Sequence, residues 1–194
     1  MGTTKIFRMS LTGGTPEVVF APATGSVTAL QSEAGVMVGR YAASTDPGQI
    51  VRFDPATKTT TTLTAFNKER LAQLRLPNPE HFWFTAKNGK KIHSIIVPPP
   101  VVEPGKRYPI IAFPHGGPNA MSDDSFSTRW NSHLLTAPGY YLIMTNYTGS
   151  TGFGEKFADD IERDVLRGPA IETLEAITEA AKKYPQMDTT RQCA

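Results

Sequence analysis

The sequence predicts a mixed α/β chain made of two incomplete parts, an antiparallel β region followed by a region of alternating strands and helices. Short strands rich in β-branched residues and separated by turns fill residues 1–75, and longer apolar strands alternate with helices from residue 76 onward. The polar stretch that ends in Leu76-Pro-Asn-Pro79 separates the two parts. At 194 residues, 39% of them hydrophobic, the chain is long enough for one good core or two small ones.

A repeat in the first part has the period of a propeller blade. Ile6-Phe-Arg-Met9 and Ile50-Val-Arg-Phe53 share an Ile-x-Arg-apolar pattern 44 residues apart, and periods of about 40 to 45 residues are typical of β-propellers. A small antiparallel sheet outside any propeller is the alternative. We expect residues 5–20, with a turn at Gly13-Gly14, to form half of one blade and four further strands to form the next, at residues 26–31, 36–42, 49–53 and 59–63.

The second part alternates between strand and helix. Two strands, at residues 81–86 and 91–97, flank Asn88-Gly89, the strongest short hairpin signal. Such alternation implies a largely parallel sheet that is covered on both faces. The remaining expected elements are strands at 110–113, 140–146 and 189–194, a helix at 125–136, and a helix at 169–184 with Ile171, Leu174, Ile177, Ala181 and Tyr184 on one stripe.

The run from Tyr108 to Pro118 joins an apolar strand to a His-Gly-Gly turn. Acyl-transfer enzymes need backbone donors aimed at the oxygen that becomes negative in the tetrahedral intermediate, and glycine lets a carbonyl approach the backbone closely. We predict that the amide of Gly117 is such an oxyanion donor, with Gly116 as the second choice; an ordinary strand-to-loop turn is the alternative. His115 is expected to order its own loop through its ring nitrogens and is a candidate for substrate contact.

Two glycine-rich motifs in this order resemble those of the prolyl oligopeptidase family of serine peptidases. They are Pro114-His-Gly-Gly-Pro118 and, about 30 residues further on, Asn146-Tyr-Thr-Gly-Ser-Thr-Gly-Phe-Gly154, followed by a helix that leads to Asp188–Ala194. The similarity is greatest to the acylaminoacyl-peptidase and dipeptidyl-peptidase branch, in which Thr45–Asp54 resembles a late propeller segment. Members of this family join a β-propeller to a carboxyl-terminal α/β-hydrolase domain.

The resemblance therefore implies the last one to two blades of a β-propeller at residues 1–75 and the amino-terminal half of an α/β-hydrolase peptidase domain at 76–194, both incomplete. It implies a serine-type exo- or oligopeptidase that hydrolyses short peptides through an acyl-enzyme. The family's serine, histidine and aspartate would all follow Ala194, so the chain is expected to be inactive alone and to need the remainder of a parent chain or a second copy to complete the fold. An esterase-type acyl hydrolase and a non-catalytic interaction fragment are the alternatives.

One position departs from the family pattern, and several residues are weaker candidates. Thr148 stands where the family usually has arginine, so the charge contact of that arginine is missing. Ser150 has glycine two residues after it but threonine two before, and therefore misses the nucleophile-elbow pattern. Asp123-Asp124 is expected in a solvated loop or helix cap. The four histidines at 81, 93, 115 and 133 are too scattered for a metal motif, and residues 149–154 lack the lysine of a phosphate loop, so no metal or cofactor is expected.

Composition narrows the choice of partners. The 20 basic and 18 acidic residues give a net charge of +2 without a block of like charge, which argues against nucleic acid and anionic membrane surfaces as partners. Cys193 is the only cysteine, so an internal disulfide is excluded. The chain opens without an apolar signal core, which we interpret as a missing native amino terminus, and the compartment, cytoplasmic or periplasmic, is left undetermined.

Overall fold

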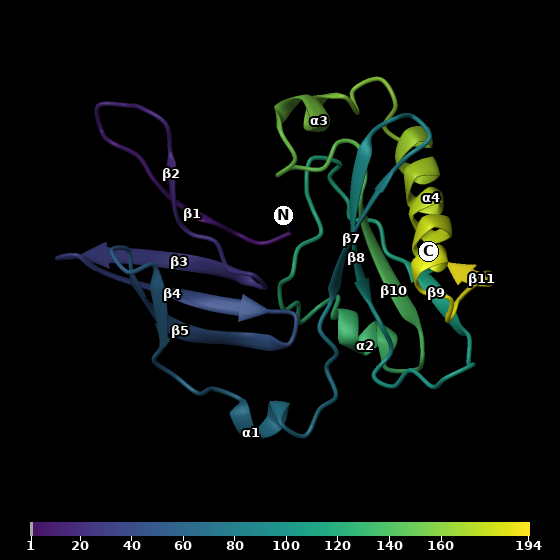
Figure 1. The fold of residues 1–194 in the computed structure, drawn as a ribbon, viewed down its shortest axis with the longest axis horizontal. Helices are drawn as coiled ribbons and strands as arrows, with labels where there is room; N and C mark the ends of the chain where they lie inside the picture. The colour runs from purple at the N-terminus through teal and green to yellow at the C-terminus, as the bar shows by residue number, and fades with distance from the viewer. Residues whose placement is uncertain (1) are drawn as a thin grey trace. The chain divides into compact units, whose positions relative to one another are not determined.

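The computed structural model describes residues 2–194, which divide into two compact units (Figure 1). The first unit contains Thr3–Arg75 together with Asp123–Thr128. The second contains Gly2, Leu76–Ser122 and Arg129–Ala194. The chain thus changes unit after Arg75, and a short segment between two elements of the second unit belongs to the first.

The first unit is built on a four-stranded antiparallel sheet with the order β3-β4-β5-β6, accompanied by a separate two-stranded pair, β1 and β2. The four expected strands of the sheet form, and β5 begins three residues earlier than expected. The short helix α1 (Lys68–Leu71) follows in the polar stretch. The strands are β1 (Ile6–Arg8), β2 (Glu17–Phe20), β3 (Ser26–Glu33), β4 (Val36–Ala43), β5 (Asp46–Asp54) and β6 (Thr59–Thr62).

Turn chemistry and a small core explain this sheet. Ala34 and Gly35, between β3 and β4, both have positive φ (48° and 77°), as a tight two-residue hairpin turn requires. The Phe20 ring meets the Phe53 ring edge-on with centroids 4.1 Å apart. These aromatic rings pack with the buried aliphatic residues Ile6, Val19, Val27 and Val51.

Asp124 lies inside the first unit, contrary to the expectation of a solvated loop or helix cap. Its side chain is 1% exposed and accepts hydrogen bonds from the backbone N–H groups of Gly25 at 2.7 Å and Ser44 at 2.9 Å. Gly25 precedes β3 and Ser44 follows β4. Because buried backbone donors need partners and a carboxylate is a strong acceptor, Asp124 satisfies two N–H groups at the end of this sheet.

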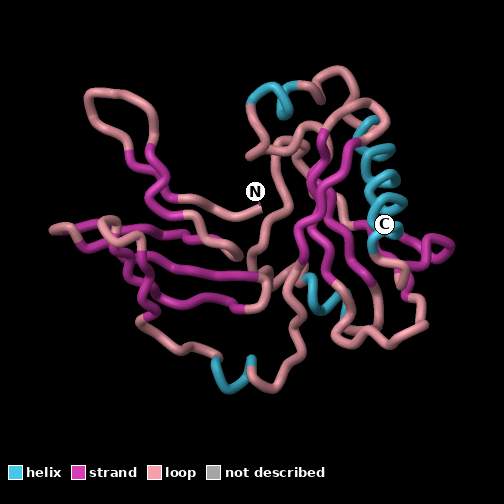
Figure 2. The backbone as a smooth tube through the Cα atoms, in the orientation of Figure 1, coloured by secondary structure: helices cyan, strands magenta, loops and turns pink. Residues whose placement is uncertain are grey.

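The second unit contains a five-stranded mixed sheet with the order β11-β9-β10-β8-β7. Its strands are drawn in magenta in Figure 2. β9, β10 and β11 are parallel, whereas β8 pairs antiparallel with both β10 and β7. The predicted parallel sheet is therefore confirmed for three strands, and the Asn88-Gly89 hairpin adds an antiparallel edge. The strands are β7 (Glu80–Thr85), β8 (Lys91–Val97), β9 (Tyr108–Ala112), β10 (Tyr141–Asn146) and β11 (Met187–Cys193).

Three helices accompany this sheet: α2 (Ser132–Thr136), α3 (Glu155–Asp159) and α4 (Arg167–Lys183). The prediction of a helix over 125–136 is wrong for its first seven residues. Asn131 caps α2 instead, since its side-chain oxygen accepts from the backbone N–H groups of His133 and Leu134, each at 3.0 Å. α3 was not predicted.

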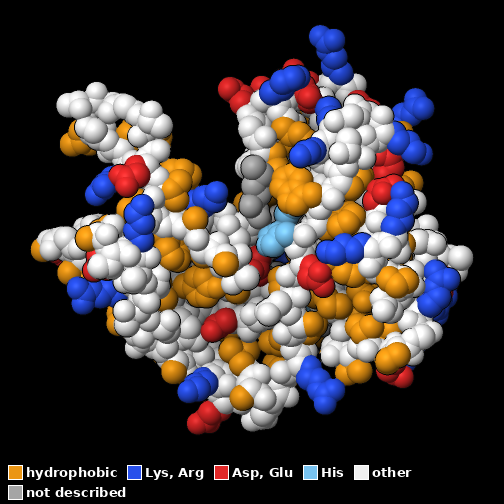
Figure 3. Space-filling view, viewed as in Figure 1, with side chains coloured by type: hydrophobic (Ala, Val, Ile, Leu, Met, Phe, Trp, Pro, Cys, Tyr) orange, Lys and Arg blue, Asp and Glu red, His pale blue; other side chains and the backbone are white. Residues whose placement is uncertain are grey.

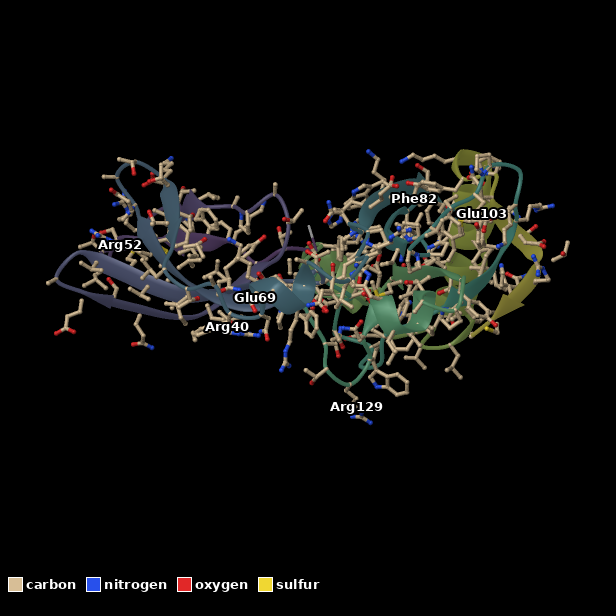
Figure 4. All side chains as sticks on the ribbon, turned by 90° about the horizontal axis from the view of Figure 1, so that it is seen from below. Arg40, Arg52, Glu69, Phe82, Glu103 and Arg129 are labelled. Carbon is tan, nitrogen blue, oxygen red and sulfur yellow. The ribbon has the colours of Figure 1, made fainter. Side chains whose placement is uncertain are left out.

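The stripe predicted for α4 is wrong in part. Ile171 and Leu174 are 44% and 57% exposed, whereas Ile177 is buried. Ala176 and Ala180 are fully buried, and their small side chains let the helix approach the sheet closely, so the larger residues on the flank are left exposed. Phe82 of β7, labelled in Figure 4, belongs to the same core. Its other buried members are Ile96, Tyr108, Ile110, Ala112, Tyr141, Ile143 and Met187.

Neither a membrane span nor a three-residue metal cluster occurs in the described part of the chain. No helix within residues 2–194 is long and apolar enough to cross a membrane. The same residues contain no group of three or more His, Cys, Asp or Glu side chains that could hold a metal ion. On the face drawn in Figure 3, basic and acidic side chains are interspersed.

Candidate active site

The candidate site lies where the parallel strands β9 and β10 end. The loop 113–122 follows β9 and the loop 147–154 follows β10, so both begin at the same edge of the sheet. The two loops are joined by hydrogen bonds from Thr151 N–H to the Ala120 carbonyl at 2.9 Å and from the Asn119 side chain to the Gly149 carbonyl at 3.1 Å. The sequence-predicted residues His115, Gly116 and Gly117 all lie in the first of these loops.

Gly116 and Gly117 present exposed backbone at this edge. Gly117 has φ +141°, and a Cβ there would come within 2.8 Å of the backbone nitrogen of Asn119, so the position requires glycine. A Cβ on Gly116 would meet nothing within 4 Å, so space is open in front of it. Within residues 2–194, neither glycine amide donates to a protein acceptor. Both N–H groups are therefore available to an oxygen of a bound molecule.

His115 connects the two loops through its ring. The imidazole stacks on the Tyr147 ring, with centroids 4.5 Å apart and an interplanar angle of 16°. Its Nε2 lies 2.8 Å from Ser150 Oγ and its Nδ1 lies 3.0 Å from the carbonyl oxygen of Gly116, while the Tyr147 hydroxyl donates to the His115 carbonyl. Burial lowers the pKa of His115 and outweighs the opposing effect of the Gly116 carbonyl, which favours the neutral ring near pH 7.

Ser150 lies as close to a histidine nitrogen as an activated nucleophile would, but a substrate cannot reach it. A serine oxygen 2.8 Å from a histidine nitrogen matches a nucleophile and its base. The residue is nevertheless 0% exposed, and its hydroxyl donates to the Tyr147 carbonyl at 2.7 Å. Ser150 therefore holds the turn after β10, in agreement with its missing elbow pattern.

Glu172 is a buried carboxylate that the sequence analysis did not identify. It is 1% exposed and accepts from Thr148 N–H at 2.7 Å, from the Thr148 hydroxyl at 2.7 Å and from the Asn88 side chain at 2.8 Å. Thr148, which stands in the usual place of an arginine, thus donates two neutral hydrogen bonds to an acidic group. The sequence could have indicated this buried carboxylate only through the position of a glutamate on the sheet-facing side of α4. Such a position is not specific for a functional or structural site.

An apolar groove of about 400 Å³ adjoins the loop after β9. Leu166 is 79% exposed and Val165 is 55% exposed at its rim, and Leu174 of α4 also contributes. The groove is thus lined by side chains of the segment before α4 and of the amino-terminal half of α4. The other lining residues are Ala112, Pro114, Tyr147, Pro169, Ala170, Thr173 and Ala194.

The family comparison and the sequence relatives agree on one family. Residues 125–194 match the model of the prolyl oligopeptidase family. This match and the relatives support a peptidase of the prolyl oligopeptidase family. The chain is 40% identical over 85 residues to dipeptidyl-peptidase 5 of Schizosaccharomyces pombe, an alignment that covers 44% of this chain and 12% of that protein. It is 49% identical over 74 residues to dipeptidyl-peptidase 5 of Trichophyton equinum, covering 38% and 10%.

Solved structures of peptidases have the same arrangement of elements. Acylaminoacyl peptidase of Pyrococcus horikoshii superposes with a TM-score of 0.78 at 25% identity, over 89% of this chain and 27% of that one. Dipeptidyl peptidase 4 of Porphyromonas gingivalis superposes with a TM-score of 0.76 over 98% of this chain and 27% of that one; at 18% identity it shows the fold alone. The chain thus spans 12% and 10% of the two dipeptidyl-peptidase 5 relatives and 27% of each of these two solved chains.

Proposed function

We propose that this chain forms part of a serine-type peptidase that hydrolyses short peptides through an acyl-enzyme, and that it supplies one oxyanion donor. The observation that carries the proposal is the pair of unbonded, exposed amides at Gly116 and Gly117, at the carboxyl end of a parallel strand in a prolyl oligopeptidase family chain. The dipeptidyl-peptidase and acylaminoacyl-peptidase names of the relatives favour short peptides as substrates.

The same proposal assigns each unit. Residues 1–75 correspond to the last one to two blades of a β-propeller, supported by the four-stranded antiparallel sheet and the pair beside it. Residues 76–194 correspond to the amino-terminal half of an α/β-hydrolase domain, supported by the mixed sheet with its three parallel strands. These 194 residues contain no Gly-x-Ser-x-Gly elbow, so the serine, histidine and aspartate of the triad are assigned to sequence outside them.

In the proposed mechanism, the scissile carbonyl oxygen points at the Gly117 N–H. The triad serine, which is assigned to sequence outside these residues, attacks the carbonyl carbon and the carbonyl oxygen becomes negative. The Gly117 N–H then stabilises this oxygen more strongly than it stabilised the neutral carbonyl. His115 is neutral and holds the loop against Tyr147 and Ser150, so the donor is fixed before the charge develops. We also propose His115 as a residue close enough to contact substrate.

A fusion enzyme tests the assignment. The chain is joined to the carboxyl-terminal region of the Schizosaccharomyces pombe relative, and hydrolysis of dipeptidyl 4-nitroanilides is measured for the fusion and for its Gly117→Ala and Gly116→Ala variants. Alanine keeps the backbone N–H, but its Cβ would come within 2.8 Å of the Asn119 backbone nitrogen and would displace the donor from its position. Because loss of one oxyanion donor costs on the order of 100-fold to 1,000-fold in kcat, we expect a loss of up to that size for Gly117→Ala, with KM little changed. Gly116→Ala, where space is open, should lose less than about tenfold.

Three outcomes would contradict the proposal. Equal and small effects of both glycine variants would show that the strained backbone at Gly117 is not needed to place an oxyanion donor. Hydrolysis of esters but not of amides would favour an esterase. Labelling of the 194-residue chain itself by a fluorophosphonate probe would contradict the expected inactivity of this part alone, and labelling at Ser150 would reverse its structural assignment.

A further inference from the structure

A line of hydrogen-bonded polar groups crosses the second unit beside the candidate site. It runs from His81 on β7 to His93 on β8, then to Asn146 at the end of β10 and to the backbone of Ser122. His93 and Asn146 are 0% exposed and lie opposite each other in the antiparallel β8–β10 pair, so their side chains share one face of the sheet. The mechanism proposed above does not use any of these groups.

The backbone of Ser122 fixes the orientation of the Asn146 amide. The Ser122 N–H donates to Asn146 Oδ1 at 2.7 Å, and the Ser122 carbonyl accepts from Asn146 Nδ2 at 3.0 Å. A backbone N–H can only donate and a carbonyl can only accept, so the amide oxygen and nitrogen cannot be exchanged. The second hydrogen of Nδ2 then points to His93 Nδ1, 2.9 Å away.

This orientation in turn fixes the proton on His93. Since Nδ2 can only donate, Nδ1 of His93 is the unprotonated acceptor and the proton of the neutral ring is on Nε2. Nε2 lies 2.9 Å from His81 Nδ1, which is therefore an acceptor too. A proton added to His93 would go on Nδ1, where it would face the Asn146 N–H group.

We propose that His93 is a positioning residue: as a neutral ring protonated on Nε2, it holds the Asn146 amide against Ser122 and thereby fixes the end of the loop that carries Gly117. That loop is held at its middle by the bonds of Asn119 and Ala120 to the β10 loop and at its end by Ser122. The effect on catalysis rests on the proposed function, whereas the protonation state of His93 does not.

The surroundings of His93 agree with a neutral ring. The groups around it include His81 and Trp83 from β7, Asn146 from β10 and Phe153 from the loop after β10, with ring centroids between 4.9 and 5.6 Å for the three aromatic contacts. Gly2 also lies against the ring, since a Cβ there would come within 3.3 Å of His93 Cε1. Burial, then the neighbouring His81 and then the positive charge of the chain's amino terminus lower the pKa of His93 to about 3.

Nitrogen NMR of the 194-residue chain tests the protonation state directly. With ¹⁵N-labelled histidine, long-range proton–nitrogen correlations distinguish protonated from unprotonated ring nitrogens, and His93→Gln identifies the signals by their loss. We expect unprotonated Nδ1 and protonated Nε2 for His93, unchanged between pH 8 and pH 5. The opposite tautomer, or an imidazolium ring at pH 6, would overturn the proposal.

The Asn146→Asp variant tests whether Asn146 sets the tautomer of His93. An aspartate oxygen accepts instead of donating, so His93 should become protonated on Nδ1 in this variant. If His93 keeps its Nε2 proton in a folded Asn146→Asp chain, the asparagine does not set the tautomer. If the variant fails to fold, the spectrum of the wild-type chain still tests the protonation state of His93.

The positioning effect is measured in the fusion enzyme. His93→Phe removes the acceptor for Asn146 and should lower kcat about tenfold, as expected for one lost buried hydrogen bond, whereas Trp83→Phe, which touches the same ring without a hydrogen bond, should change kcat less than about twofold. Equal effects of the two variants would reject the positioning role. A fusion that is inactive before mutation would count against the proposed function, and the NMR result would stand separately.

Discussion

Replacing Glu172 by alanine removes a buried acceptor that ties α4 to the loop after β10. Two of its three donors, the N–H and the hydroxyl of Thr148, are buried, and they would be left without a partner. The third, the amide of Asn88, is exposed and can turn to water. At about 1 to 3 kcal/mol for each buried unsatisfied group, Glu172→Ala should lower the free energy of unfolding by about 3 kcal/mol.

Glu175→Ala is the matched control, since Glu175 lies one turn further along α4 and, among residues 2–194, accepts a single exposed hydrogen bond, from Lys87 N–H at 3.0 Å. The gain in helix propensity on replacing glutamate by alanine is the same in both variants and cancels in the comparison. We expect the control to change the free energy of unfolding by no more than about 0.5 kcal/mol.

Urea denaturation followed by tryptophan fluorescence measures the difference. Both tryptophans, Trp83 and Trp130, lie in the second unit, so the signal reports the unit that contains Glu172. With a urea dependence of roughly 2 kcal/mol per molar, the Glu172→Ala midpoint should fall by about 1.5 M. A midpoint equal to that of Glu175→Ala would refute the reasoning, because the carboxylate would then not be needed by its donors.

Three further predictions concern single contacts. Thr148→Val keeps the shape but loses the hydroxyl donor, and a double-mutant cycle with Glu172→Ala should give a coupling of about 1 to 2 kcal/mol; a coupling near zero would contradict the contact. His93 has a pKa of about 3 in the folded chain and 6.5 ordinarily. As the pH falls, the unfolded chain therefore takes up a proton at this histidine at a higher pH than the folded chain does. The stabilising contribution of His93 is complete above about pH 6.5 and falls by about 2 kcal/mol on going from pH 8 to pH 5, a loss that His93→Gln should abolish. Asp124→Asn should speed hydrogen exchange of the Gly25 and Ser44 amides about tenfold, measured by NMR, whereas Asp123→Asn should leave both rates unchanged.

The strands were predictable because their signals are local. The Asn88-Gly89 turn and the alternation beside it placed β7 and β8, since hairpin geometry depends on φ values that only a few residue types adopt readily. Short runs rich in β-branched residues placed β3 and β4. The start of α2 was missed although Asn131 is a recognisable cap, because the polar residues before it were interpreted as part of the helix.

The errors occurred where packing, not local preference, decides burial. On α4 the predicted stripe included Ile171 and Leu174, which are exposed, while Glu172 is buried between them. Hydrophobicity alone favours the opposite arrangement. Thr148 and Asn88, which are distant in sequence from Glu172, compensate its charge, and no local pattern records that compensation.

From the sequence alone came the strands, the His-Gly-Gly loop and the resemblance to the prolyl oligopeptidase family, because strand periodicity, glycine turns and motif spacing depend on residues that are close together in the chain. Only the tertiary structure decided that Asp124 belongs to the first unit, that Ser150 is enclosed beside His115, and that Ser122, Asn146 and His93 form one line. These contacts join residues between 24 and 99 positions apart, and they form because buried donors and acceptors must find partners wherever the fold brings them together.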